Sequence, residues 1–125
     1  MSSKLKVGMK YVLEHTVRED ETAFNYDSGA MHVYSTPAMI ARMECAAHTM
    51  LMEAGLDSVG TIVNIEHKKA CKPGTVVVAE ALLTEIDGKR ITFDVKVTDR
   101  EGNILGEGTH GRYIIDPERF MQKIG

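Results

Sequence analysis

The chain has 125 residues, with 15 Lys and Arg against 18 Asp and Glu, and 43% of its residues are hydrophobic. This length suits one domain with a single hydrophobic core, which we expect to span residues 1–125. The mildly acidic balance gives no reason to expect binding to nucleic acid or to an anionic membrane, and no apolar segment approaches the roughly 20 residues that cross a bilayer.

The N-terminus and the cysteines indicate a cytoplasmic protein. Residues 1–6 include charges but no apolar stretch follows them, so we expect no secretion signal. Cys45 and Cys71 have neither metal-binding nor redox spacing, which is typical of reduced cytosolic thiols. The spacing of Cys45 and His48 supplies at most half of a metal site, so we expect no metal and no cofactor.

The first predicted element is a strand over residues 10–17, which are rich in β-branched and aromatic side chains. Residues 19–34 mix acidic, small and aromatic residues, and they predict a loop with one short helical turn. Loops of this length in compact domains are usually functional or mobile, so one interpretation is a lid.

A helix is the clearest prediction. Thr36 suits the N-cap, Pro37 suits the first turn, and Gly55 suits the position after the last turn, so the helix should run from Ala38 to about Ala54. Its apolar residues cover most of the circumference: Met39, Ile40, Ala41, Met43, Cys45, Ala46, Ala47, Met50, Leu51 and Met52. A helix that is apolar on nearly all sides is a buried helix, so a sheet should curl around it.

Four further strands follow the helix. They are predicted over residues 61–66, 75–83, 91–98 and 104–115. Turn signals separate them, and the strongest is the two-residue hairpin signal Asp87-Gly88. Asp116-Pro117 then predicts the cap of a short C-terminal helix. This order of elements predicts an α+β protein with one five-stranded antiparallel sheet and one long buried helix.

The last predicted strand places Gly106, Gly108, His110 and Arg112 on one face, because strand residues alternate with a period of two. Two interpretations carry similar weight: the glycines let a helix backbone approach closely, or they mark a bulge in a weak strand. From the pattern alone, Arg112 is more typical of a solvated charge.

Glu44 lies in the middle of the predicted helix, with Ile40 and Ala47 on the same face. A desolvated carboxylate costs several kcal/mol unless it is paired, so a buried Glu44 needs a partner or a function. The alternative is a narrow exposed edge beside Arg42 and His48. Periodicity favours neither interpretation.

Thr36 and His67 have ordinary structural explanations. Capping the helix accounts for Thr36. His67 ends a strand whose inward face is predicted as Thr61, Val63, Ile65 and His67. An inward histidine on an apolar face is more often a hydrogen-bonded core residue than a catalyst.

Several short motifs, taken together, carry a resemblance to a known family. They are Ser35-Thr36-Pro37-x-Met39-Ile40-x-x-Met43-Glu44-x-Ala46, then Gly60-Thr61 with His67, then Pro73-Gly74, and last Gly106-x-Gly108-Thr109-His110-x-Arg112. In this order and spacing they resemble the hotdog-fold thioesterases of the fluoroacetyl-CoA thioesterase type over about residues 6–120. The segment before Thr36, where the fluoroacetyl-selective enzyme places its substrate gate, does not share the pattern.

The resemblance implies a hotdog fold and an acyl-CoA thioesterase that acts on a small or medium acyl group without a cofactor. It implies that Thr36, Glu44 and His67 are catalytic, that the Gly60 N–H binds the substrate carbonyl, and that Arg112 lies in the substrate site. The chemistry agrees, since thioester cleavage needs an oxygen nucleophile, a base and oxyanion donors. Thr36 either attacks or positions a water, and Glu44 either orients the nucleophile or attacks to form an anhydride.

The resemblance also implies a homodimer or a higher homo-oligomer, joined sheet edge to sheet edge, with Glu44 and His67 of one site in different subunits. One competing hypothesis is a non-catalytic acyl-CoA-binding module, which would not need Glu44 and His67 together. A hydratase is another, but it would need an Asp-x-x-x-x-His arrangement. Asp57 and Asp87 have no histidine five residues later.

Overall fold

The computed structural model describes residues 4–125; residues 1–3, which begin the segment predicted to carry no secretion signal, lie outside the described residues. Along the chain the elements are β1 (Lys10–Thr16), the 3₁₀-helix η2 (Glu19–Glu21), α1 (Thr36–Glu53), β2 (Asp57–His67), β3 (Val76–Asp87), β4 (Arg90–Asp99), β5 (Ile104–Ile115) and α2 (Pro117–Lys123). None of the helices between residues 4 and 125 combines the length and the apolar character that a bilayer crossing requires.

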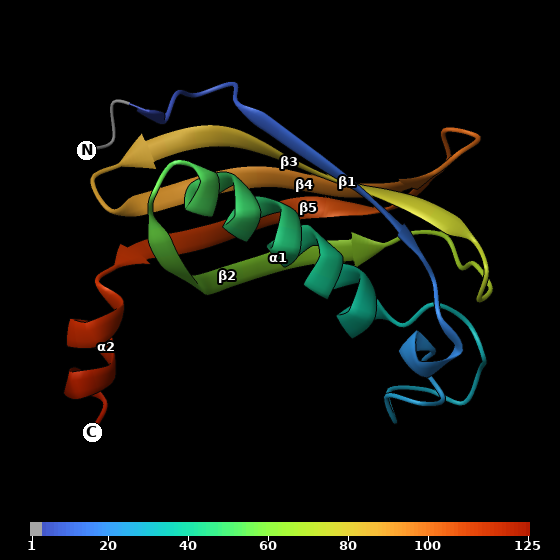
Figure 1. The fold of residues 1–125 in the computed structure, drawn as a ribbon. Coiled ribbons are helices and arrows are strands. Elements are labelled where there is room, and N and C mark those ends of the chain that lie inside the picture. The colour runs from blue at the N-terminus through green and yellow to red at the C-terminus, as the bar shows by residue number, and fades with distance from the viewer. Residues whose placement is uncertain (1–3) are drawn as a thin grey trace.

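The five strands form one antiparallel sheet in the order β1-β3-β4-β5-β2. This confirms the predicted α+β class and strand number. The sheet curves around one side of α1, and α2 extends away beyond the end of β5 (Figure 1). The strand β2 follows α1 in sequence but pairs with the last strand, so it is an edge strand of the sheet.

The core lies between α1 and the concave face of the sheet. The buried residues of α1 form one stripe: Ala38, Met39, Met43, Ala46, Ala47, Met50 and Leu51. They pack with alternate residues of β3 and β4, namely Val77, Ala79, Ala81, Leu83, Ile91, Phe93, Val95 and Val97. The period-two alternation predicted for the fourth strand is therefore confirmed.

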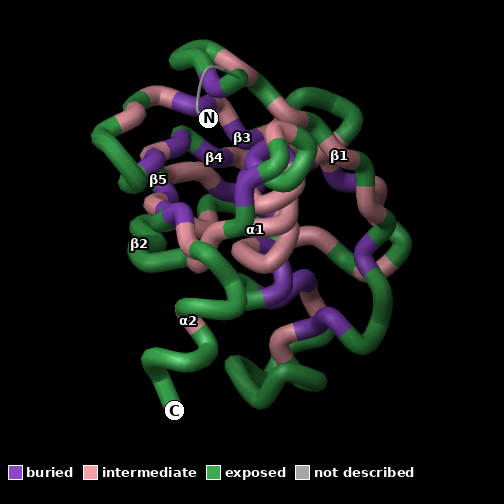
Figure 2. Tube along the Cα trace, turned by 60° about the vertical axis from the view of Figure 1, so that its left-hand side comes forward, coloured by how far each residue is buried: buried purple, intermediate pink, exposed green. Residues whose placement is uncertain are grey.

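The prediction that α1 is buried on all sides was wrong for the single chain. Ile40 and Cys45 are only half-buried, and Met52 is 52% exposed. The physical reason is that the sheet covers one side of the helix only, and Figure 2 shows the other side of α1 as partly exposed. The uncovered side therefore leaves apolar surface beside β2.

The N-cap of α1 lies one residue before the predicted one, and the helix begins at Thr36 rather than Ala38. Ser35, in an extended conformation, is the N-cap, and its hydroxyl accepts a 3.1 Å hydrogen bond from the Ala38 N–H. Thr36 is the first helical residue, so its hydroxyl has no capping role. Both residue types are good caps, and they stand side by side in the sequence. At the other end, Gly55 has a φ of 81° and ends the helix as predicted.

The strand bounds differ from the predictions mainly at β2 and β3. β2 begins at Asp57 rather than Thr61, and β3 extends to Asp87 rather than Leu83. The turn after β3 consists of Gly88 and Lys89, one residue later than predicted, and Gly88 has a φ of 62°. β5 has the predicted bounds. The predicted C-terminal helix is also present, with Asp116 accepting from the Arg119 N–H.

The predicted inward face of β2 was only partly right. Ile65 and His67 are half-buried, but Thr61 is exposed and Val63 is 45% exposed. A register shift between Gly60 and Ile62 interrupts the alternation at Thr61. Val63 follows this shift and shares a face with Ile65 and His67, so the shift does not account for its exposure.

The close approach predicted for the β5 glycines occurs, but with different neighbours. A Cβ on Gly106 would collide with the Met39 side chain, and a Cβ on Gly108 would collide with the backbone carbonyl of Asn64 in β2. A helix side chain and a neighbouring strand therefore fill the space, rather than the helix backbone of the first interpretation. A register shift beside Gly106, where Val97 pairs with Gly106 and Thr98 with Ile104, agrees with the second interpretation.

Candidate active site

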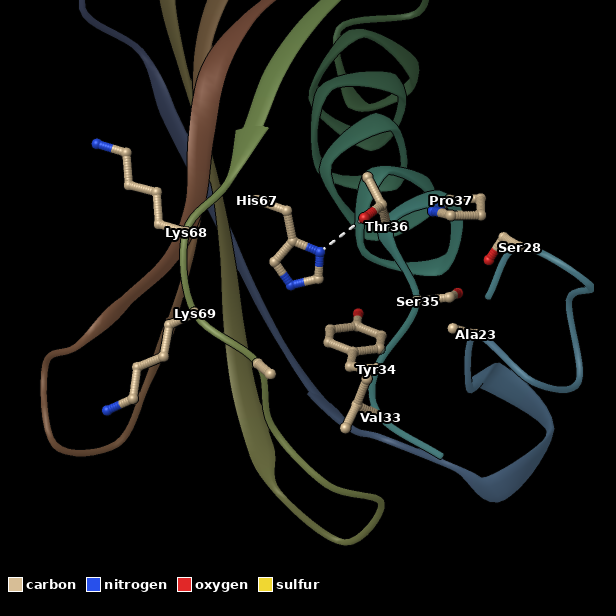
Figure 3. Close-up of a pocket in the computed structure, with 11 residues that line it drawn as sticks. Ala23, Ser28, Val33, Tyr34, Ser35, Thr36, Pro37, His67, Lys68 and Lys69 are labelled. Atoms are coloured by element: carbon tan, nitrogen blue, oxygen red, sulfur yellow. Dashed lines mark hydrogen bonds between the residues drawn. The ribbon is translucent and has the colours of Figure 1, made fainter. Parts of the chain in front are cut away.

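The start of α1 and the end of β2 bring two of the predicted catalytic residues together. Thr36 Oγ1 lies 2.8 Å from His67 Nδ1 (Figure 3). The pair borders a pocket of about 340 Å³, whose other lining residues are Ala23, Ser28, Val33, Tyr34, Ser35, Pro37, Lys68, Lys69 and Ala70. Because Ser35 makes the helix cap, the Thr36 hydroxyl is free to make this contact.

The surroundings of His67 favour its neutral form. Burial lowers the pKa of His67, and the backbone of Lys69 opposes this by favouring the protonated ring. A neutral imidazole with its lone pair on Nδ1 can accept a proton from the Thr36 hydroxyl. The pair therefore has the hydroxyl-to-base geometry that general-base catalysis requires.

The other predicted residues form a second group around Gly60. A Cβ on Gly60 would lie 2.9 Å from Glu44 Oε2 and 3.4 Å from Arg112 Nη1, so both side chains press against the glycine. These three residues, with Cys45, His48 and Ser58, line a separate open pocket of about 400 Å³. With glycine here, the Glu44 carboxylate keeps its position; a Cβ would require it to shift.

Arg112 is a buried charge, so its interpretation as a solvated residue was wrong. It is 8% exposed, and its Nε donates to Ser58 Oγ over 2.8 Å while Nη2 donates to the Ser58 carbonyl over 3.3 Å. Burial lowers the pKa of Arg112, and the negative charge of Glu44 opposes that effect. Glu44 itself is half-buried on the side of α1 that the sheet leaves uncovered, so it has both a semi-exposed position and a cationic neighbour.

In one chain, the two groups are far apart. Gly60 and His67 are separated along β2 by about 23 Å, at roughly 3.3 Å per residue. Thr36 and Glu44 are separated along α1 by about 12 Å, at roughly 1.5 Å per residue. The structure thus joins Thr36 with His67, and Glu44 with Gly60 and Arg112, but it does not join the two sets.

Sequence reasoning missed three residues that support these groups. His110 is buried beside Arg112, Ser58 accepts from the Arg112 guanidinium, and Tyr34 is 1% exposed beside Thr36. The only sequence signals were the shared face of His110 and Arg112 and the position of Tyr34 just before Ser35-Thr36. Within residues 4–125, no three His, Cys, Asp or Glu side chains are placed to hold a metal ion.

Comparisons with known proteins identify the family of the chain. The family profile of the fluoroacetyl-CoA-specific thioesterase FlK matches residues 17–118. A fluoroacetyl-CoA thioesterase of Streptantibioticus cattleyicolor is 35% identical over 95 residues, which cover 74% of this chain and 68% of that protein.

Solved structures show the same fold. A mutant of the fluoroacetyl-CoA-specific thioesterase FlK in complex with fluoroacetate and CoA superposes with a TM-score of 0.86 at 28% identity, covering 93% of this chain and 99% of that one. A hot-dog-like protein from Thermanaerovibrio acidaminovorans gives a TM-score of 0.87 at 20% identity, covering 98% and 93%. The five-stranded sheet and its central helix are therefore a hotdog fold.

Proposed function

This chain belongs to the fluoroacetyl-CoA-specific thioesterase family, and we propose that it hydrolyses the thioester of a small or medium acyl-CoA to the free acid and CoA. The observation that carries the proposal is the 2.8 Å contact between the Thr36 hydroxyl and His67 Nδ1 at the edge of an open pocket. A hydroxyl and a base in contact at a helix start are the components that acyl transfer to water requires.

In the proposed reaction, His67 is the base and the Gly60 N–H binds the carbonyl oxygen. Either Thr36 attacks the carbonyl carbon, giving an ester on Thr36 that a water then hydrolyses, or Thr36 positions a water that attacks directly. Glu44 orients that nucleophile, or attacks first to give an anhydride that water opens. The new C–O bond replaces the C–S bond, and the departing CoA sulfur takes a proton from His67. Arg112 holds an anionic or carbonyl group of the substrate.

We further propose that the active unit is a homodimer or a higher homo-oligomer in the cytoplasm, with each protomer one hotdog domain over residues 1–125. Gly60 and His67 cannot act on one thioester while about 23 Å of β2 separates them. A second copy of the chain can bring Gly60 and His67 together. This requires that the β2 edges of the two copies pair antiparallel around a two-fold axis between Val63 and Asn64. Gly60 then lies beside the His67 of the other copy. The same contact would cover Ile62 and Val63, which are 57% and 45% exposed.

The activity is tested by incubating the protein with a panel of acyl-CoAs, fluoroacetyl-CoA among them, and a thiol reagent that reports free CoA. Release of CoA supports the thioesterase. Binding without release favours the acyl-CoA-binding module. Loss of an enoyl absorbance without free thiol would mean a hydratase.

The shared site is tested by mixing two inactive variants, Glu44→Gln and His67→Gln. Each alone should lose a hundredfold or more of kcat, as expected for a general base and its partner. After unfolding and refolding together, half of the dimers are mixed, and each mixed dimer has one intact site of two. About a quarter of the wild-type rate should return, by random pairing of subunits in a two-fold dimer.

The control for the mixing experiment is Glu44→Gln mixed with the double variant, which offers no intact site of the shared kind. If the first mixture recovers no more activity than this control, the two residues belong to the same subunit or act independently. The proposed dimer would then be wrong even if CoA release is observed.

A further inference from the structure

Two buried polar atoms beside Thr36 have no hydrogen-bond partner within the described chain. They are the Tyr34 hydroxyl and His67 Nε2; the third such side-chain atom, Arg42 Nε, belongs to a residue that does not line this pocket. In Figure 3 the Tyr34 hydroxyl points toward the His67 ring. A buried polar atom without a partner costs about 1–3 kcal/mol, so each needs an explanation.

Neither a substrate nor a second copy of the chain reaches Nε2 in this arrangement. Both atoms are already covered by other atoms, each with less than 1 Å² of accessible surface. A bound acyl group or a residue of a second copy cannot touch Nε2 unless those covering atoms move. A backbone contact of Lys69 with the His67 ring raises the pKa of His67, but it falls short of the distance and angle of a hydrogen bond to Nε2. This leaves the Tyr34 hydroxyl as the buried, unpaired group facing the ring.

We propose that Tyr34 is a positioning residue for His67. The Tyr34 hydroxyl oxygen accepts a hydrogen bond from the Nε2–H of the His67 ring. The contact fixes the tautomer that leaves a lone pair on Nδ1, so that Nδ1 can take the Thr36 proton. The inference rests on the proposed thioesterase function. Catalytic hydrogen bonds are often long or poorly aligned before substrate binds and tighten in the complex. Thr36, His67 and Tyr34 thus form a nucleophile, a base and a group that orients the base.

The backbone holds Tyr34 in place for this role. Its N–H donates to the Cys71 carbonyl over 2.8 Å, and the next N–H, of Ser35, donates to the Glu21 carbonyl over 3.0 Å. Glu21 is itself buried and bonded to His15 over 2.7 Å. The ring therefore enters the pocket wall from a segment that is tied to two other parts of the chain.

The surroundings of Tyr34 also keep its phenol protonated. Burial raises the pKa of Tyr34, the charge of Glu21 raises it further, and the charge of Arg42 opposes both. Tyr34 is thus a neutral hydrogen-bonding group over the working pH range, and it does not compete with His67 as a base.

Tyr34→Phe tests the proposal because it keeps the ring and removes only the oxygen. We expect kcat to fall about tenfold while KM stays within about twofold, since the lost contact acts on the base and not on substrate binding. The acid limb of the kcat profile should move to lower pH, because the Tyr34 oxygen stabilises the protonated ring. Tyr11→Phe on β1, at the opposite edge of the sheet from β2, is the control and should keep wild-type kinetics.

A measurement that does not need activity is the nitrogen NMR spectrum of His67. Above its pKa, His67 in the wild-type protein should be protonated on Nε2, and Tyr34→Phe should shift the ring toward the Nδ1-protonated tautomer. A wild-type ring protonated mainly on Nδ1 would overturn the proposal, even if the variant fails to fold.

Two other results for Tyr34→Phe would also reject the positioning role. A raised KM with unchanged kcat would make Tyr34 a substrate contact, and a lower melting temperature with an unchanged pH profile would make it a structural residue; either overturns the proposal. If the tautomer shifts in the variant but the wild-type protein cleaves no thioester, the Tyr34–His67 contact stands and the proposed function fails.

Discussion

Arg112 Nη1 donates a hydrogen bond to His110 Nε2 across 3.2 Å, from two residues along the same strand. The Ile62 carbonyl lies 2.8 Å from His110 Nδ1, and because a carbonyl only accepts, Nδ1 carries the proton and Nε2 has the lone pair. Burial and then the charge of Arg112 lower the pKa of His110. A neutral His110 therefore fixes the direction of a buried guanidinium.

Removing either Arg112 or His110 should weaken catalysis, because in both cases the Arg112 guanidinium is lost from its position. We expect Arg112→Ala to lower kcat/KM by about tenfold or more and His110→Phe to lower it less, since His110 acts only through Arg112. The double variant should be close to Arg112→Ala alone, because residues in one network are not additive. Steady-state kinetics checks this, with Arg119→Ala on α2 as a control. Multiplicative losses in the double variant would contradict the shared route.

The pH dependence of the rate should reflect His67. Its pKa lies below the ordinary value of about 6.5 because burial disfavours the charged ring. The neutral ring is the base, so kcat/KM should be constant near pH 7 and fall as the pH drops through a value below 6.5. Rates with one acyl-CoA from about pH 4.5 to 8 would show this limb. A limb centred above 6.5 would mean that another group controls the rate.

The two close-packed glycines of β5 should respond differently to alanine. The Cβ of Gly108→Ala would collide with the Asn64 carbonyl, which is backbone of a paired strand. The Cβ of Gly106→Ala would mainly meet the flexible end of Met39, and it would lie 3.0 Å from the Glu66 carbonyl. Overpacking costs about 1–3 kcal/mol, and more when backbone must move. We expect Gly108→Ala to lose about 3 kcal/mol or more of unfolding free energy and Gly106→Ala about 1 kcal/mol. Urea unfolding at one protein concentration measures both, and equal losses would contradict the assignment.

The helix cap should affect both stability and rate. Ser35→Ala removes the acceptor for the Ala38 N–H, at a cost of about 1 kcal/mol, and it loosens the turn that presents Thr36 to His67. We expect a lower melting temperature together with a lower kcat. Ser35→Thr keeps a hydroxyl at the cap and should retain most of both properties. A fully stable Ser35→Ala protein would show that the cap contributes little.

Local signals made much of the fold predictable. The alternation of Ile91, Phe93, Val95 and Val97, the stop at Gly55 and the cap at Asp116 depend on near neighbours in sequence, and the structure has all of them. The exposed side of α1 was not predictable in this way, because it depends on how far the sheet curls.

The candidate site likewise has features that the sequence motifs predict and features that depend on contacts between distant residues. The motif resemblance selected Thr36 and His67, but their contact joins residues 31 positions apart, which periodicity cannot reveal. The burial of Arg112 depends on acceptors at Ser58 and His110, and those become visible only once β2 and β5 pair. Tyr34 was missed for a related reason, since its hydroxyl points toward a ring on a different element.

The order of strands also determines how long β2 waits for its partner strand during synthesis on the ribosome. β2 emerges directly after α1, yet its partner β5 is the last strand of the sheet, and His67 pairs there with Gly106. At about 5–20 residues per second, the wait between them is roughly 2–10 s, during which both sides of β2 are open and Ile62 and Val63 are uncovered. A nascent chain is therefore most prone to aggregation in that interval, and one that stops before Ile104 leaves Gly60 and His67 on a strand without its partner in the sheet.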